Sequence, residues 1–261
     1  MTSRVTAFAP ATVANITVGF DSLGLCLDHF GDRVTIEKSE ATGVSIQEIE
    51  GTSVLLPLDP AKNTATLGVL SLYSEQSPDF GLRVSIKKGL PIGSGLGSSA
   101  CSSVAGVCAA ARLIAPDLSK EDLLSYCLEG EALAHGVGNA DNIAPCLLGG
   151  MVFVAEDSPL RLLRLKVPAS LWVTVFHQDV FVPTEKARAL LPSEVSTRTA
   201  VLQSRRLAEF LLLLERGSLR DLSEVLEDYL AEPYRKNLIP HFEEFRIAAR
   251  DAGAFHLGIS G

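Results

Sequence analysis

Apolar and polar side chains alternate along several short stretches of the chain, which is the pattern of strands with one buried face. The clearest stretch is 82–88, where the apolar side chains fall at every second position up to Ile86. Runs of β-branched residues bounded by glycine or proline predict further strands. The predicted strands span 4–9, 32–37, 44–49, 82–88, 151–154, 161–165, 171–176 and 254–259.

Between these stretches, apolar residues recur three and four positions apart, as on one face of a helix. One helix is expected to begin at Ser119, because Asp122 stands three residues later in a variant of the capping box. A change of pattern near residues 150–160 suggests a domain boundary there. The predicted helices span 63–73, 98–114, 119–135, 184–190, 198–215, 218–230 and 240–251.

Composition narrows the possible functions. The 261 residues, 47% of them hydrophobic and 21% charged, suffice for one large or two modest globular domains. The net charge of −8 gives no general attraction to nucleic acid or anionic membranes, so backbone N–H groups and a metal would have to attract any phosphate ligand. The five cysteines include no C-x-x-C pair and are expected to be buried thiols in a reducing cytoplasm. Neither a secretory signal nor an apolar run of roughly 20 residues is expected in this sequence.

A glycine-rich loop joins the strand predicted at 82–88 to the helix predicted at 98–114. Its glycines alternate as G-x-G-x-G, which permits positive φ and lets a ligand approach the backbone closely. Ser98 and Ser99 stand at the start of the helix, where free N–H groups and the helix dipole favour an anion. No Lys-Ser/Thr pair follows the last glycine, so this is not a Walker A motif. The loop predicts a polyphosphate site, with a tight helix–sheet turn as the alternative.

Polar residues interrupt three otherwise apolar segments. Asn15 and Asp21 stand among Val, Ile and Phe, in an Asx turn or a ligand site. Glu131 lies on the apolar face of its predicted helix, so its carboxylate must be hydrogen-bonded, paired or bound to a metal. Asp141 and Asn142 precede an apolar run, and either could simply cap a helix.

The loop sequence Pro-Ile-Gly-Ser-Gly-Leu-Gly-Ser-Ser-Ala resembles the second signature of the GHMP kinases. The segments 11–21 and 139–150 resemble those of the members that phosphorylate homoserine. The resemblance implies two α+β domains. One would be a nucleotide-binding domain at 1–155, similar to domain 2 of ribosomal protein S5, and the other a ferredoxin-like domain at 156–261. Family members continue for some tens of residues beyond the third signature, so the second domain is expected to be incomplete. The similar segments stand in the family's order, at 11–21, 91–100, 139–150, 184–192, 232–240 and 251–261.

The resemblance also implies a reaction, in which ATP phosphorylates the hydroxyl of L-homoserine in threonine biosynthesis. Asn63 would lie near the nucleotide base, and Ser99 and Glu131 would hold Mg²⁺. Asp141 would face the substrate hydroxyl beside Asn142, either as a general base or only to align it. The phosphates would be held by Pro91, Ile92, Gly93, Ser94, Gly95, Leu96, Gly97, Ser98, Ser99, Ala100 and Cys101. The amino-acid substrate would be held by Asn15, Asp21, Asn139, Arg188 and Arg235.

Several alternatives remain open from the sequence. Arg188 and Arg235 suit a carboxylate, but each alone could be a solvated surface charge. The family members usually carry His where this chain has Asn139, and Asn can donate a hydrogen bond but cannot become cationic. Another alcohol such as mevalonate, or a catalytically silent GHMP-like binding protein, would also fit the motifs. The family further implies a possible homodimer.

Overall fold

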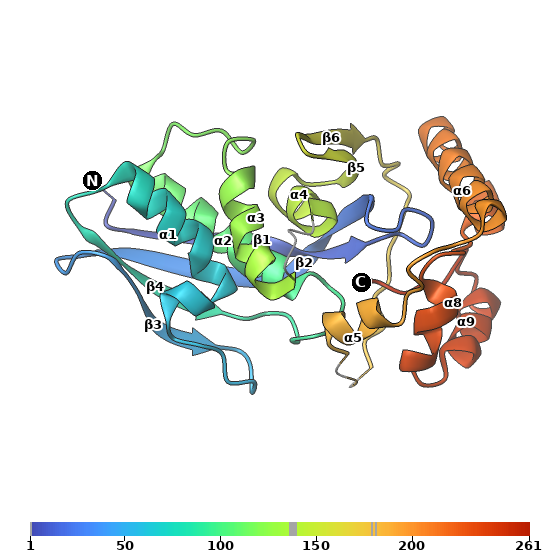
Figure 1. The fold of residues 1–261 in the computed structure, drawn as a ribbon, viewed down its shortest axis with the longest axis horizontal. Coiled ribbons are helices and arrows are strands. Elements are labelled where there is room, and N and C mark those ends of the chain that lie inside the picture. The colour runs from blue at the N-terminus through green and yellow to red at the C-terminus, as the bar shows by residue number, and fades with distance from the viewer. Residues whose placement is uncertain (1, 136–139, 179, 181) are drawn as a thin grey trace.

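One mixed sheet forms the centre of the computed structural model, which describes residues 2–135, 140–178, 180 and 182–261 (Figure 1). Its strand order is β3-β4-β2-β5-β6, with β1 paired to β2. β3 and β4 are parallel and the other pairs are antiparallel. The strands are β1 (Arg4–Ala14), β2 (Leu23–Ser39), β3 (Val44–Glu50), β4 (Gly81–Lys87), β5 (Met151–Asp157) and β6 (Leu160–Leu165).

The long strand β2 organises the sheet. Its second half pairs with β4 and its first residues pair with β5, while β1 pairs along both parts. Alternating residues of these strands, such as Val34, Ile36, Val84 and Ile86, are buried in the main core. The alternation in the sequence therefore marks the face of the sheet that the helices cover.

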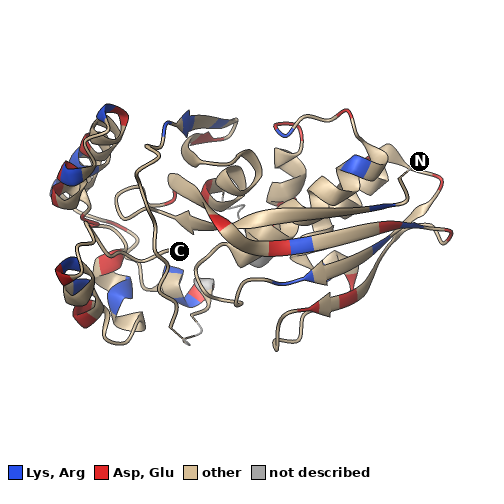
Figure 2. Ribbon diagram, turned by 180° about the vertical axis from the view of Figure 1, so that it is seen from behind, with Lys and Arg blue, Asp and Glu red and all other residues tan. Residues whose placement is uncertain are grey.

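Four helices cover that face of the sheet, three of them in contact with strands and the fourth packed on those three (Figure 1). In the opposite view the strands lie in front of these helices (Figure 2). Helix α2 is rich in alanine and is buried over most of its length, so it can lie close to both the sheet and α1. The four helices are α1 (Thr64–Gln76), α2 (Ser98–Ile114), α3 (Leu124–His135) and α4 (Ala140–Leu148).

The second half of the chain is mainly helical. It contains short 3-10 helices at Leu219–Asp221 and Lys236–Leu238, and another lies at Pro60–Lys62 in the first half. A smaller core forms where Phe210, Leu214, Leu222 and Val225 pack against Leu23 of the sheet. The described helices here are α5 (Thr184–Ala189), α6 (Thr197–Arg216), α7 (Leu222–Val225), α8 (Glu232–Arg235) and α9 (Phe242–Asp251). The division into domains at residue 155 stays a prediction.

The structure corrects two predicted helices. Ser119 and Asp122 do exchange the expected hydrogen bonds, with Ser119 N to Asp122 Oδ2 at 2.8 Å, but they close a turn, and α3 begins only at Leu124. The helix predicted at 218–230 ends at Val225, because the Asp228 carboxylate accepts the N–H groups of residues 230, 231 and 232 and fixes a turn there.

Two predicted strands are also wrong. Neither 171–176 nor 254–259 is paired with a neighbouring strand among the described residues, and an extended segment without such pairing is not part of a sheet. The described residues thus form a single sheet, and the α+β content is confirmed. No helix in this part of the chain is both long and apolar enough to cross a membrane. All five cysteines are free, and three of them are buried.

Candidate active site

The glycine-rich loop runs from the end of β4 to the first turn of α2. Gly93, Gly95 and Gly97 all have left-handed φ values, of 75°, 73° and 66°. A Cβ atom on Gly95 would lie 2.2 Å from the Ser260 carbonyl oxygen, and one on Gly97 would lie 2.0 Å from Thr12 Oγ1. Both positions therefore require glycine, for backbone conformation and for space. The packing of Ser260 and Thr12 against the loop fixes its course.

Polar groups of this loop are available to an anion. Ser94 Oγ and Ser98 Oγ are buried and have no hydrogen-bond partner among the described residues. The first N–H groups of α2 have no acceptor within the helix, and the helix dipole adds positive potential there. Buried hydroxyls without partners are costly, and phosphate oxygens would satisfy them. The loop therefore fits the polyphosphate of ATP.

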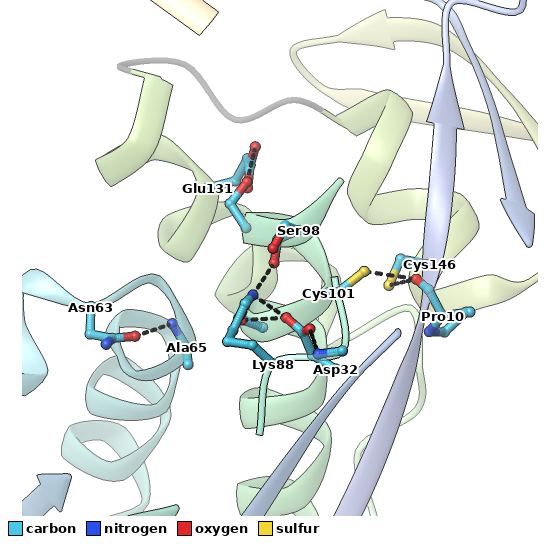
Figure 3. Close-up of polar contacts among 12 residues, drawn as sticks. Pro10, Asp32, Asn63, Ala65, Lys88, Ser98, Cys101, Glu131 and Cys146 are labelled. Atoms are coloured by element: carbon cyan, nitrogen blue, oxygen red, sulfur yellow. Dashed lines mark hydrogen bonds and ion pairs between the residues drawn. The ribbon is translucent and has the colours of Figure 1, made fainter. Parts of the chain in front are cut away.

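A buried carboxylate lies beside the loop. Ser99 Oγ donates to Glu131 Oε1 at 3.1 Å. Glu131 belongs to α3 and is only 2% exposed (Figure 3). A hydroxyl and a carboxylate are hard oxygen ligands that suit Mg²⁺ when phosphate oxygens complete the shell. Among the described residues no cluster of three or more His, Cys, Asp or Glu could hold a metal alone. Ser99 and Glu131 therefore fit a metal that is shared with the nucleotide.

Asp141 lies in the first turn of α4 and is 5% exposed. Its pKa is raised from 3.8 to about 7, chiefly by burial. The charge of Asp21 contributes to this rise, whereas Arg188 opposes it. The neighbouring Asn142 donates from Nδ2 to Asp141 Oδ1 at 3.3 Å. Asn142 Oδ1 in turn accepts from Thr12 Oγ1 at 2.6 Å. An aspartate with a pKa near 7 can accept a proton much more readily than an ordinary one.

The predicted substrate residues of the two halves of the chain come together. Arg188 forms two hydrogen bonds with the carboxylate of Asp21, both at 3.1 Å. Asn15 Oδ1 accepts from the backbone N–H of Asp21 at 2.9 Å. This hydrogen bond spans six residues and closes the turn between them, whereas an Asx turn would be closed to the residue two positions further on. Arg235 donates to the carbonyl oxygens of Ala187 and Gly261, at 3.1 and 3.0 Å.

A small pocket lies next to these residues and is lined in part by Asn15, Thr17 and Arg235. Three consecutive residues of this turn, 15 to 17, have positive φ although none is glycine. Such a run is strained and persists only where the surroundings hold it, as is common at ligand sites.

The other predicted residues take different positions. Asn63 caps α1, with Oδ1 accepting from Ala65 N at 3.0 Å (Figure 3). Its Nδ2 donates to Pro57 O at 2.8 Å. Ala100 and Cys101 point into the core, where Cys101 Sγ contacts Pro10 O at 2.9 Å. Asn139 lies outside the described residues.

Three functional candidates escaped the sequence reasoning. Thr12 joins the loop to Asn142, and Asp32 with Lys88 forms a buried ion pair below the loop (Figure 3). The sequence offers two signals for the ion pair: Asp32 is a charged residue in the predicted strand 32–37, and Lys88 directly precedes the glycine-rich loop. Neither signal identifies its partner.

Comparison with known proteins gives the family of the chain and its fold. Residues 64–150 match the family model of the GHMP kinases N terminal domain. The homoserine kinase of Chloroherpeton thalassium is 37% identical over 270 residues, covering 99% of this chain and 84% of that protein. That of Xylella fastidiosa is 39% identical, covering 98% of this chain and 78% of that protein. The crystal structure of homoserine kinase from Cytophaga hutchinsonii superposes with a TM-score of 0.97 at 41% identity, covering 100% of this chain and 83% of that one.

The fold and the glycine-rich site define a GHMP kinase. The curated relatives that are 37 and 39% identical over nearly the whole of this chain are homoserine kinases, one branch of that class. The chain belongs to the homoserine kinase family.

Proposed function

We propose that this chain transfers the γ-phosphoryl group of ATP to the hydroxyl of L-homoserine, which gives O-phospho-L-homoserine for threonine biosynthesis. One observation carries the proposal for these residues. Gly97 of the phosphate-type loop lies against Thr12 and Asn142, so the loop adjoins the turn that bears Asp141. A phosphoryl donor in the loop would therefore meet an acceptor hydroxyl beside Asp141.

The nucleotide would be held mainly by the backbone of residues 91–101 and by the hydroxyls of Ser94 and Ser98. Asn63, whose side chain fixes the turn before α1, would shape the site of the base. Ser99 and Glu131 would hold Mg²⁺, which supplies positive charge to the phosphate oxygens when bound. Because the chain carries a net charge of −8, this local positive potential is needed for an anionic nucleotide.

The amino-acid end of the substrate would lie at the Asp21–Arg188 pair. Asp21 suits an ammonium group, whereas Arg188 and the nearby Arg235 suit a carboxylate. Asn15 would orient this turn through the N–H of Asp21. Asn139 would complete the site as a hydrogen-bond donor.

The hydroxyl proton would move to Asp141 as the new O–P bond forms and the bond from the γ-phosphorus to ADP breaks. With a pKa of about 7, Asp141 can take this proton near neutral pH and release it afterwards. Asn142, held by Thr12, would keep the carboxylate turned toward the hydroxyl. We further expect a cytoplasmic enzyme and a homodimer.

The test is release of ADP from Mg-ATP, with and without L-homoserine, by the native chain and by Asp141→Asn. A general base contributes about 10²- to 10⁴-fold to kcat, so the variant should lose at least about 100-fold and also lose any pH dependence near 7. Asp122→Asn, which changes an exposed carboxylate that has no part in the proposed site, is the control and should keep its rate.

Three results would change the proposal. A kcat loss below about tenfold with the pH profile intact would reduce Asp141 to an aligning role. Turnover with mevalonate and not with homoserine would refute the substrate. ATP binding without turnover of any alcohol would support the binding-protein alternative.

A further inference from the structure

A buried ion pair lies directly below the glycine-rich loop. Lys88 Nζ contacts the carboxylate of Asp32, and the two side chains are 2% and 0% exposed (Figure 3). Lys88 also donates to the Ser98 carbonyl oxygen at 2.9 Å and to Ser102 Oγ at 2.7 Å. An ammonium group has three N–H donors, so these contacts use all of them. Lys88 therefore has no donor left for a phosphate and can act only through its partners.

Asp32 completes the network from strand β2. Its Oδ1 accepts from the backbone N–H of Gly89 at 2.9 Å, and its Oδ2 accepts from Ser102 Oγ at 2.7 Å. Gly89 is the residue at which the chain leaves β4 for the loop, whereas Ser98 and Ser102 lie in the first turns of α2. The network thus ties both ends of the loop to one point in the sheet.

We propose that Asp32, Lys88 and Ser102 are positioning residues that set the span of the phosphate loop and so determine the affinity for ATP. The inference rests on the proposed function, because it assumes that the loop binds ATP. A buried charge pair is favourable only when every hydrogen-bonding group is satisfied, and this one is satisfied by the two segments that flank the loop. Loss of one member should shift the loop ends and leave the substrate site at Asp21 and Arg188 unchanged.

Ser102→Ala is the gentlest test, because it removes one hydroxyl and keeps both charges. Tyr73→Phe is the matched control. The Tyr73 hydroxyl also makes two hydrogen bonds, accepting from Gly43 N at 2.8 Å and donating to Phe80 O at 3.0 Å, but it lies at the opposite end of β4. The measurements are the Kd of ATP, the KM of L-homoserine and the thermal midpoint of each protein.

We expect Ser102→Ala to weaken ATP binding by about tenfold, which equals about 1.4 kcal/mol, with the KM of homoserine unchanged. Tyr73→Phe should lower the midpoint without changing the Kd of ATP. If Ser102→Ala does not fold, Ser102→Cys keeps the volume with a weaker hydrogen-bonding group and should show a smaller rise in the same Kd.

The inference fails if a folded Ser102 variant has the same Kd for ATP as Tyr73→Phe. It also fails if the Kd of ATP and the KM of homoserine rise by the same factor. If the native chain itself does not bind ATP, the proposed function fails instead, so the two failures are distinguishable.

Discussion

Asp141 should destabilise the ligand-free protein at neutral and alkaline pH. Its pKa is raised from 3.8 to about 7, chiefly by burial, so the folded state holds a proton that the unfolded state has already released. Below the unfolded pKa the carboxyl is protonated in both states and costs nothing. As the pH rises from 3.8 through about 7, the folded state loses stability relative to the unfolded state.

The pKa difference between 3.8 and about 7 corresponds to about 4 kcal/mol at about 1.36 kcal/mol per unit. Relaxation around the buried charge reduces this cost, so Asp141→Asn should gain about 2–4 kcal/mol at pH 8. For a chain of this size that equals a rise of about 4–7 °C in the thermal midpoint. The Asn side chain has the same shape, and its Oδ1 can still accept from Asn142.

Thermal unfolding without nucleotide, metal or substrate, at pH 5 and pH 8, measures this effect. The gain from Asp141→Asn should be about twice as large or more at pH 8, because at pH 5 only part of the penalty has developed. Asp122→Asn is the control, because the pKa of Asp122 is shifted in the opposite direction to that of Asp141. Hydrogen bonds from Ser119 lower the pKa of Asp122, so that substitution should not stabilise the protein at pH 8. Equal gains of Asp141→Asn at both pH values, or a loss at pH 8, would refute the reasoning.

Two further predictions concern His256 and Glu131. Burial lowers the pKa of His256 to about 4, so the native chain should lose stability as the pH falls from 6.5 toward 4. His256→Gln can keep the 3.0 Å contact to Thr17 Oγ1 and should reduce that loss. Unfolding measured at pH 4.5 and 7.5 tests this. If His256→Gln loses as much stability between pH 7.5 and pH 4.5 as the native chain does, His256 is not the cause of that loss. Glu131→Gln should raise the Mg²⁺ concentration for half-maximal activity by about tenfold or more, with the KM of homoserine unchanged, as measured in a metal titration. An unaltered metal requirement would remove Glu131 from the metal site.

The sequence predicts best those features that are fixed by local geometry. Helix α2 begins and ends where the glycines and Pro116 predict, since left-handed glycines and a proline restrict the backbone whatever packs around them. The burial of Glu131 follows from the apolar face of its helix. The start of α3 was mispredicted because the capping bonds of Ser119 stabilise a lone turn equally well.

Features that depend on a distant partner could not be derived from pattern alone. Lys88 and Asp32 are 56 residues apart, and neither periodicity nor composition links them. The segment 171–176 has strand-like composition, yet a strand exists only with a neighbour to pair with. Asp21 and Arg188, 167 residues apart, were assigned to one site only through the family resemblance.

The Asp21–Arg188 pair bears directly on the choice of substrate. Both side chains are 40–46% exposed, so their attraction is weak and readily exchanged for other charged partners. An amino-acid zwitterion can replace this one pair by two, with its ammonium on Asp21 and its carboxylate on Arg188. A hydroxy acid without an amino group would occupy Arg188 and leave the Asp21 carboxylate without its partner, close to Asp141, whose pKa it already raises. With the substrate at this proposed site, the charge balance therefore favours homoserine over a mevalonate-type alcohol.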